Sequence, residues 1–167
     1  ALLKAVVDGS SSRPRSLWIT EVNWPLKGTG EYSPASGKPN VSEEEQADYL
    51  VRYFVLCLSS GFIERIYWWQ LVAPGYGLVD SRGKEWRKRP GFYAFKTMVS
   101  FLKKSSFLGK MQHTQAEIFL FSKAEERLAI CWTINKGEQT SIVFPKRVIR
   151  VINRDGQEIP CRNSKIN

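Results

Sequence analysis

The sequence predicts an α/β fold with a parallel sheet, followed by a small antiparallel sheet of the half-sandwich kind. The first observation is the order of segments up to residue 102, which runs helix, strand, helix, strand, helix, as in βαβ units. The second is a change of character after about Phe107, where short strand candidates follow one another with polar turns between them. We therefore expect two domains, residues 1–105 and residues 106–167.

The first predicted strand follows a short helix end. Residues 1–8 have a helical pattern that Gly9 and a Ser-rich turn bring to an end. The apolar run Leu17–Val22 is rich in β-forming residues and has the continuous character of a strand buried on both faces. A long loop rich in Gly, Pro, Ser and Lys then extends from Asn23 to Val41.

The next helix has a clear start and a clear stop. Ser42 and Glu45 have the spacing of a capping box, and Gly61 is the predicted end. Between them apolar residues recur at helical spacing and predict one buried face, formed by Ala47, Leu50, Val51, Phe54 and Leu58.

A second strand and a last helix complete the first domain. Phe62–Leu71 predicts another buried strand, which ends in a glycine-rich loop that contains Tyr76. A basic loop follows, and Pro90 suits the first position of a helix that reaches about Leu102. In the second domain, the strand candidates are residues 116–121, 128–133, 140–144 and 148–153.

The composition is typical of a soluble globular protein and does not identify its binding partners. The net charge is +9, but the basic residues are spread out and no nucleic-acid motif accompanies them. We interpret most of this charge as a solvated surface and rank nucleic-acid binding last. Aromatic residues make up 13% of the chain, a supply that suits both large cores and stacking on sugar rings. We expect no membrane partner, because no apolar span is visible, and an export signal would have to precede Ala1.

The cysteine pattern gives no sign of a metal centre or cofactor. Cys57, Cys131 and Cys161 are widely spaced, and His113 is the single histidine, so we expect no metal site. Cys57 and Cys131 lie in apolar stretches and are interpreted as small core residues. A disulfide between Cys131 and Cys161 stays open as an alternative.

Glu21 is the first candidate for chemistry. It closes an apolar strand beside Trp18 and Trp24, at the strand end where parallel α/β folds place their active sites. From spacing alone, a strand-end glutamate that is exposed or paired with an arginine is at least as good an interpretation.

The second strand adds aromatic candidates at the same end. Trp68, Trp69 and Gln70 follow one another, and strand alternation sends neighbouring side chains to opposite faces, so one indole can face a binding site. The alternative is that both indoles are core. Tyr76 is a candidate for substrate contact, with a packing role equally open.

Three segments together resemble a known group of enzymes. Trp18–Val22 resembles the seventh strand of the clan of retaining (β/α)8-barrel glycoside hydrolases that holds cellulases and β-xylosidases. Arg65–Leu71 is similar to the eighth strand, and Arg89–Lys96 is similar to the start of the eighth helix. The resemblance covers about residues 1–105 and implies the last two βα units of a TIM barrel, followed by a β-domain.

The resemblance also implies an activity and site residues. Glu21 corresponds to the nucleophile, and the implied substrate is a β-linked oligo- or polysaccharide, with binding residues Trp24, Trp68, Trp69, Gln70 and Tyr76. Retaining hydrolysis needs a second carboxyl group about 5 Å away, the acid/base, which the clan carries at the end of its fourth strand. No Asn-Glu pair of that kind occurs here, so we expect this chain by itself to be inactive.

A barrel of this type needs about 250 residues, so 167 residues correspond to its C-terminal part. We expect the missing barrel part or self-association to bury Trp18, Ile66 and Trp68. The alternative from another class is a non-catalytic carbohydrate-binding or interaction module on the β-rich half. It would need exposed aromatic residues on one sheet face, whereas the available ones have the pattern of core: Phe119, Phe121, Trp132 and Phe144.

Overall fold

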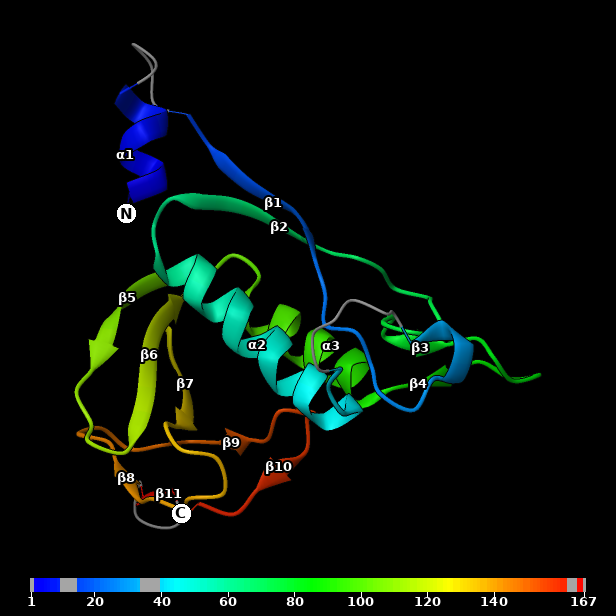
Figure 1. Cartoon of the computed structure of the whole chain (residues 1–167). Helices are drawn as coiled ribbons and strands as arrows, with labels where there is room; N and C mark the ends of the chain where they lie inside the picture. The colour runs from blue at the N-terminus through cyan, green and yellow to red at the C-terminus, as the bar shows by residue number, and fades with distance from the viewer. Residues whose placement is uncertain (1, 10–14, 34–39, 162–164, 167) are drawn as a thin grey trace. The chain divides into compact units, whose positions relative to one another are not determined.

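The structure, a computed structural model, describes residues 2–9, 15–33, 40–161 and 165–166. It contains both helices and strands, with several small sheets (Figure 1). The chain divides into two compact units, Ala1–Phe92 and Tyr93–Asn167. This division falls within helix α3, Pro90–Leu102, so the domain limits 1–105 and 106–167 stay a prediction.

The first unit is built on a βαβ arrangement. Strand β1, Leu17–Val22, is followed by helix α2, Glu43–Ser59, and by strand β2, Ile63–Trp68. The two strands pair in parallel, with Leu17 opposite Ile63 and Val22 opposite Trp68. The predicted strand–helix–strand order and parallel pairing are therefore confirmed, although β2 is shorter than the predicted run 62–71.

The expectation that both strands are buried is wrong for this chain. No residue of β1 or β2 is buried, and Trp18 is 49% exposed. A two-stranded sheet leaves each strand with one unpaired edge, which explains the exposure. Most buried residues of this unit lie instead in α2 and in the connections that follow the two strands. They include Leu26, Ala47, Leu50, Phe54, Val55, Ala73 and Leu78.

Helix α2 begins as the sequence predicts. The Ser42 hydroxyl accepts a hydrogen bond from the Glu45 amide at 3.1 Å, and the Ser42 amide donates to the Glu45 carboxylate at 2.9 Å. This capping box satisfies two amides that the first helical turn leaves without partners. Ala47, Leu50 and Phe54 are buried as predicted, whereas Leu58 is exposed. The buried face of the helix also includes Gln46 and Val55 and does not extend to Leu58.

The remaining elements of the first unit include some that the sequence did not predict. Helix α1, Leu2–Gly9, lies where a helix end was predicted, and α3 has the predicted bounds. A short hairpin of β3, Val79–Asp80, and β4, Arg87–Lys88, occupies the stretch predicted as a basic loop. The long connection after β1 contains a 3-10 turn, η1, Gly30–Tyr32, and its residues 34–39 lie outside the described part.

The second unit contains the predicted antiparallel sheet. Strands β5, Ser106–Met111, β6, Ala116–Lys123, and β7, Glu126–Thr133, lie side by side in that order (Figure 1). Two small antiparallel pairs accompany them: β8, Ile142–Val143, with β11, Lys165–Ile166, and β9, Val151–Ile152, with β10, Glu158–Ile159. The predicted strands 140–144 and 148–153 are thus reduced to two residues each.

The core of this unit lies along β6. Ala116 and Ile118 are buried with Ile142, and half-buried Cys131 packs against them. None of Cys57, Cys131 and Cys161 forms a disulfide, so the open alternative of a Cys131–Cys161 bridge is not realised. Among the described helices, none has both the length and the apolar character needed to cross a membrane.

Candidate functional site

The candidate site lies at the carboxyl end of β1 and β2. Glu21 is the next-to-last residue of β1, and its side chain is exposed. Val22 pairs with Trp68, and the Trp69 amide donates to the Val22 carbonyl at 3.0 Å. Because the strands are parallel, their carboxyl ends meet at one edge, which brings Glu21 and Trp69 to neighbouring strand ends.

The two adjacent indoles have different surroundings. Trp68 stacks on Trp24 with ring centroids 6.0 Å apart, and Trp24 in turn contacts Tyr49 and Tyr53 of α2, each at 5.7 Å. Trp69 is 46% exposed. Trp24 and Trp68 therefore form an aromatic layer against α2, whereas Trp69 is open to solvent at the strand end.

A fully buried glutamine joins the loops that follow the two strands. The Gln46 side-chain amide of α2 donates to the Trp24 carbonyl at 2.9 Å and to the Tyr76 carbonyl at 3.0 Å. The Leu26 amide adds a direct bond to the Gly75 carbonyl at 2.8 Å. These bonds hold the segments of Trp24 and Tyr76 together. The sequence contained a signal for this role of Gln46. It lies four residues before Leu50, which places its polar side chain on the face of the helix that was predicted to be buried.

Arg89 fixes the loop that carries Tyr76. Its side chain is fully buried and donates to the carbonyls of Ala73, Pro74 and Gly77 at 2.9, 2.6 and 2.7 Å. Its guanidinium also contacts the carboxylates of Glu43 at 3.1 Å and Asp80 at 3.2 Å. An arginine fork can satisfy this many acceptors, and the loop is held in one shape as a result.

Gly77 is needed for the same loop. A Cβ atom at this position would lie 2.2 Å from the Ala73 backbone nitrogen, a distance that only a backbone shift can relieve. We expect Gly77→Ala to lower the free energy of unfolding by about 2 kcal/mol or more. Urea unfolding of the two proteins measures this difference. Gly83→Ala, in the turn of the β3–β4 hairpin, is the matched control: its Cβ would have 3.3 Å to the nearest atom, so its loss should be smaller.

The β3–β4 hairpin is held by a cluster of charged side chains. Arg82 bonds both oxygens of Asp80 at 2.9 and 2.6 Å, and Arg87 bonds both oxygens of Glu43 at 2.9 and 2.6 Å. The Arg82 hydrogen bonds hold the pKa of Asp80 well below its usual range, although burial opposes them. Hydrogen bonding by Arg87 likewise lowers the pKa of Glu43.

This charge cluster predicts a loss of stability in acid. A carboxyl group whose pKa is lower in the folded state stabilises the fold above its unfolded pKa of about 3.9, and this stabilisation is lost as the pH falls toward the folded pKa. We therefore expect the stability gap between the native protein and Asp80→Asn to be large at pH 7 and to shrink below about pH 4. Urea midpoints measured across this range test the expectation, and a gap independent of pH would contradict it.

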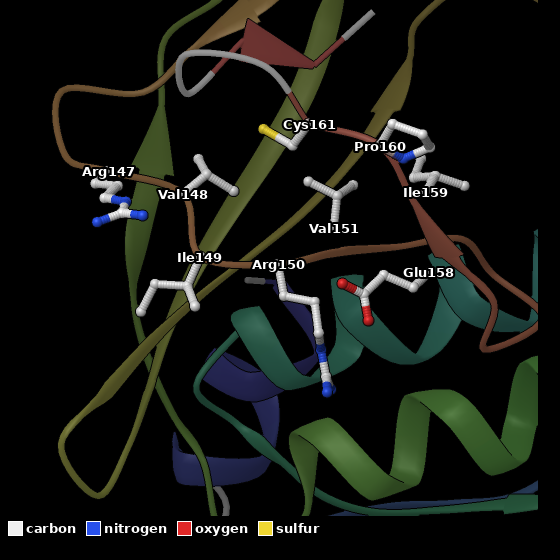
Figure 2. A pocket seen from close by; sticks show the side chains of 9 residues that line it. All are labelled: Arg147, Val148, Ile149, Arg150, Val151, Glu158, Ile159, Pro160 and Cys161. Carbon is white, nitrogen blue, oxygen red and sulfur yellow. The ribbon is translucent and has the colours of Figure 1, made fainter.

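The second unit has a hollow of about 700 Å³, whose lining differs from that of the candidate site. Figure 2 shows Val148, Val151 and Cys161 around it, while Arg150 extends away. Among the described residues that line it, Glu158 is the one carboxylate, and these residues include none of the predicted site residues. The described lining of this hollow thus offers no pair of carboxyl groups of the kind that retaining hydrolysis uses. Within the described residues, no group of His, Cys, Asp or Glu side chains is placed to hold a metal ion.

Comparison with known proteins adds one finding. No protein-family profile and no curated protein sequence matches the chain. Among solved structures, a family 39 glycoside hydrolase from the gut symbiont Bacteroides cellulosilyticus WH2 is similar, with a TM-score of 0.73 over 98% of this chain. The chain has the fold of part of that hydrolase. The sequences are 23% identical, and this chain spans 34% of the length of that one.

The predicted resemblance to glycoside hydrolases is thereby confirmed at the level of fold. At this identity the likeness concerns the fold, so the roles of Glu21, Trp24, Trp68, Trp69, Gln70 and Tyr76 stay predictions. The described residues bring Trp24, Trp68 and the Tyr76 backbone together around α2. Gln70 follows Trp69 directly in the chain, and its side-chain amide donates to the Val72 carbonyl at 2.9 Å.

Proposed function

We propose that this chain is the C-terminal part of a retaining glycoside hydrolase that acts on β-linked glycans, with Glu21 as its nucleophile. The observation that carries the proposal is the position of Glu21, an exposed carboxylate at the carboxyl end of a parallel strand, beside the strand end that bears Trp69. In (β/α)8 barrels this edge bears the active site. The shared fold with a glycoside hydrolase supports the same interpretation.

The reaction would proceed by double displacement. The Glu21 carboxylate attacks the anomeric carbon and forms a glycosyl ester, while a second carboxyl group donates a proton to the leaving oxygen. The same second group then takes a proton from water, which attacks the anomeric carbon, breaks its bond to the Glu21 oxygen and releases the Glu21 carboxylate. We assign this second group to a part of the protein outside these 167 residues and expect this chain by itself to be inactive.

The remaining site residues divide by their surroundings. Trp69 offers an exposed ring for the apolar face of a sugar, and Tyr76 and Gln70 lie in the connection that Gln46 and Arg89 hold. We propose that these three residues contact the glycan. Trp24 and Trp68 pack in a layer against α2. We propose that this layer forms the base of the glycan-binding site.

The stereochemistry of the product tests the proposal. The whole encoded protein is incubated with a panel of 4-nitrophenyl β-glycosides, and the configuration of the first-formed sugar is followed by proton NMR. Retention of the β-configuration is the expected result, and the 167-residue chain assayed beside it should show no turnover. Inversion, or the absence of turnover by the whole protein across the panel, would contradict the proposal.

The alternative of a carbohydrate-binding module on the β-rich half has less support. Phe119 and Phe121 are each 1% exposed, and Trp132 and Phe144 are half-buried, so these rings do not form an exposed row. Nucleic-acid binding is also weakened, because two arginines of the basic stretch 84–89, Arg87 and Arg89, are paired with carboxylates.

A further inference from the structure

The β3–β4 hairpin presents a tryptophan to solvent. Trp86 is 67% exposed, more than any other described aromatic residue among the exposed hydrophobic side chains. Within the described part of the chain, its indole has neither a ring partner nor a hydrogen-bond partner. A tryptophan ring can bury about 150–250 Å² on contact with a partner, so this ring has a large contact area to offer.

The base of this hairpin is fixed by many bonds. Trp86 directly precedes β4, where Arg87 pairs with Asp80 and Lys88 pairs with Val79 in the strand ladder. The Arg87 side chain bonds Glu43 of α2, and the Arg89 amide bonds the Leu78 carbonyl at 3.0 Å. Because the backbone next to Trp86 is held in place, binding would have to order the indole side chain alone, which lowers the entropic cost of a contact.

The hairpin also lies at the edge of the proposed site. It belongs to the connection between the carboxyl end of β2 and the start of α3, and such connections lie on the same edge as Glu21. Arg82 of the hairpin approaches the Gly28 carbonyl at 3.5 Å, in the loop that follows the strand of Glu21. Trp86 therefore stands on the loops of that edge, outside the strand ends that bear Glu21 and Trp69.

We propose that Trp86 is an outer sugar-binding position, at which its indole stacks on the apolar face of a pyranose ring. Its neighbours Lys84 and Glu85 are exposed and have no ion-pair partner among the described residues, so both can bond sugar hydroxyls. The inference rests on the proposed function and narrows it to a substrate class. The glycan extends beyond the two sugars that flank the cleaved bond, so the substrate is a longer oligosaccharide or a polysaccharide.

Chain-length dependence tests the kinetic side of this inference in the whole protein. The measured quantity is kcat/KM on β-1,4-linked hexasaccharides of glucose, xylose and mannose, divided by kcat/KM on the matching 4-nitrophenyl β-glycoside. For the hexasaccharide that the native protein cleaves best, we expect Trp86→Ala to lower this ratio about tenfold, the scale of one lost aromatic stacking contact. Trp86→Tyr should restore most of it. Ile149→Ala, which removes an exposed apolar side chain from the other unit, is the control.

A binding measurement keeps the inference separate from catalysis. The same hexasaccharides are titrated calorimetrically into the whole protein with and without Trp86→Ala, in both cases in a Glu21→Gln background that prevents hydrolysis. Weaker binding after Trp86→Ala supports the outer position even if the native protein proves catalytically inactive. Such inactivity would contradict the proposed hydrolase function but not the outer binding position. Unchanged binding by Trp86→Ala overturns the inference. Unchanged binding together with a lowered melting temperature would show that protein, rather than glycan, covers the ring.

Discussion

Glu21→Gln in the whole encoded protein is expected to lower kcat by about 10⁴-fold or more, the scale seen when a catalytic nucleophile is removed. Gln has the shape of Glu but cannot form the glycosyl ester, so the chemical step is lost while the side-chain volume is kept. Because Glu21 is exposed, the melting temperature should change little. Initial rates on the best 4-nitrophenyl β-glycoside measure the loss.

A matched control comes from the same sheet. Glu64 is an exposed glutamate near the start of β2, at the opposite end from the proposed site, where its carboxylate accepts a bond from the Trp18 indole at 3.2 Å. Glu64→Gln should leave kcat close to that of the native protein. Equal losses from the two substitutions would indicate a general effect on the strand pair and would remove Glu21 from the nucleophile role.

Arg89→Met is expected to lower the free energy of unfolding by about 3–5 kcal/mol, because it leaves buried acceptors unpaired. The substitution keeps an apolar chain of similar length but withdraws the bonds to Ala73, Pro74 and Gly77 and the contacts to Glu43 and Asp80. Urea unfolding of this chain gives the measurement. Arg89→Lys should recover little, because a single ammonium group cannot reach acceptors that a planar fork reaches together.

The control for Arg89 is an exposed arginine of the same unit. Arg65 of β2 has a side chain that is 54% exposed and lies 3.9 Å from Glu64, and its guanidinium sits over the Trp18 ring. Arg65→Met should cost about 1 kcal/mol or less, as is usual for exposed ion pairs. A loss below about 1 kcal/mol for Arg89→Met as well would contradict the role given to the buried guanidinium.

Elements with strong local signals were predictable from the sequence. The capping box of Ser42 and Glu45, the stop at Gly61 and the first turn of α3 at Pro90 depend on a few neighbouring residues, and all three lie where they were predicted. The antiparallel character of the second unit followed from closely spaced strands. Strand β5 was missed because Gly109 and a register shift break its alternation.

Features that depend on distant contacts were out of reach. Nothing local to Arg89 reveals that its side chain is fully buried among carbonyls about 12 to 16 residues earlier in the chain. The role of Gln46 likewise depends on loops that come together only after folding. The prediction that β1 and β2 are buried was wrong. Apolar composition indicates that a strand can be buried, whereas its actual burial depends on which elements cover it.

The position of Glu21 at a strand end was predictable, and its proximity to Trp69 followed from parallel pairing. The hairpin that presents Trp86 was not predicted, because its strands are two residues long and are held by ion pairs between distant residues. Charged side chains in a loop give no sequence signal for such partners.

Covalent labelling is the most direct test of Glu21 as the nucleophile. The whole protein is incubated with the 2-deoxy-2-fluoro β-glycoside that matches its best 4-nitrophenyl substrate, and a protease digest is analysed by mass spectrometry. Slow hydrolysis of the fluorinated ester lets the glycosyl enzyme accumulate. The account predicts a fluoroglycosyl group on the peptide that contains Glu21. A label on another carboxylate, or steady turnover of ordinary substrates with Glu21 left unlabelled by an effective inactivator, would contradict it.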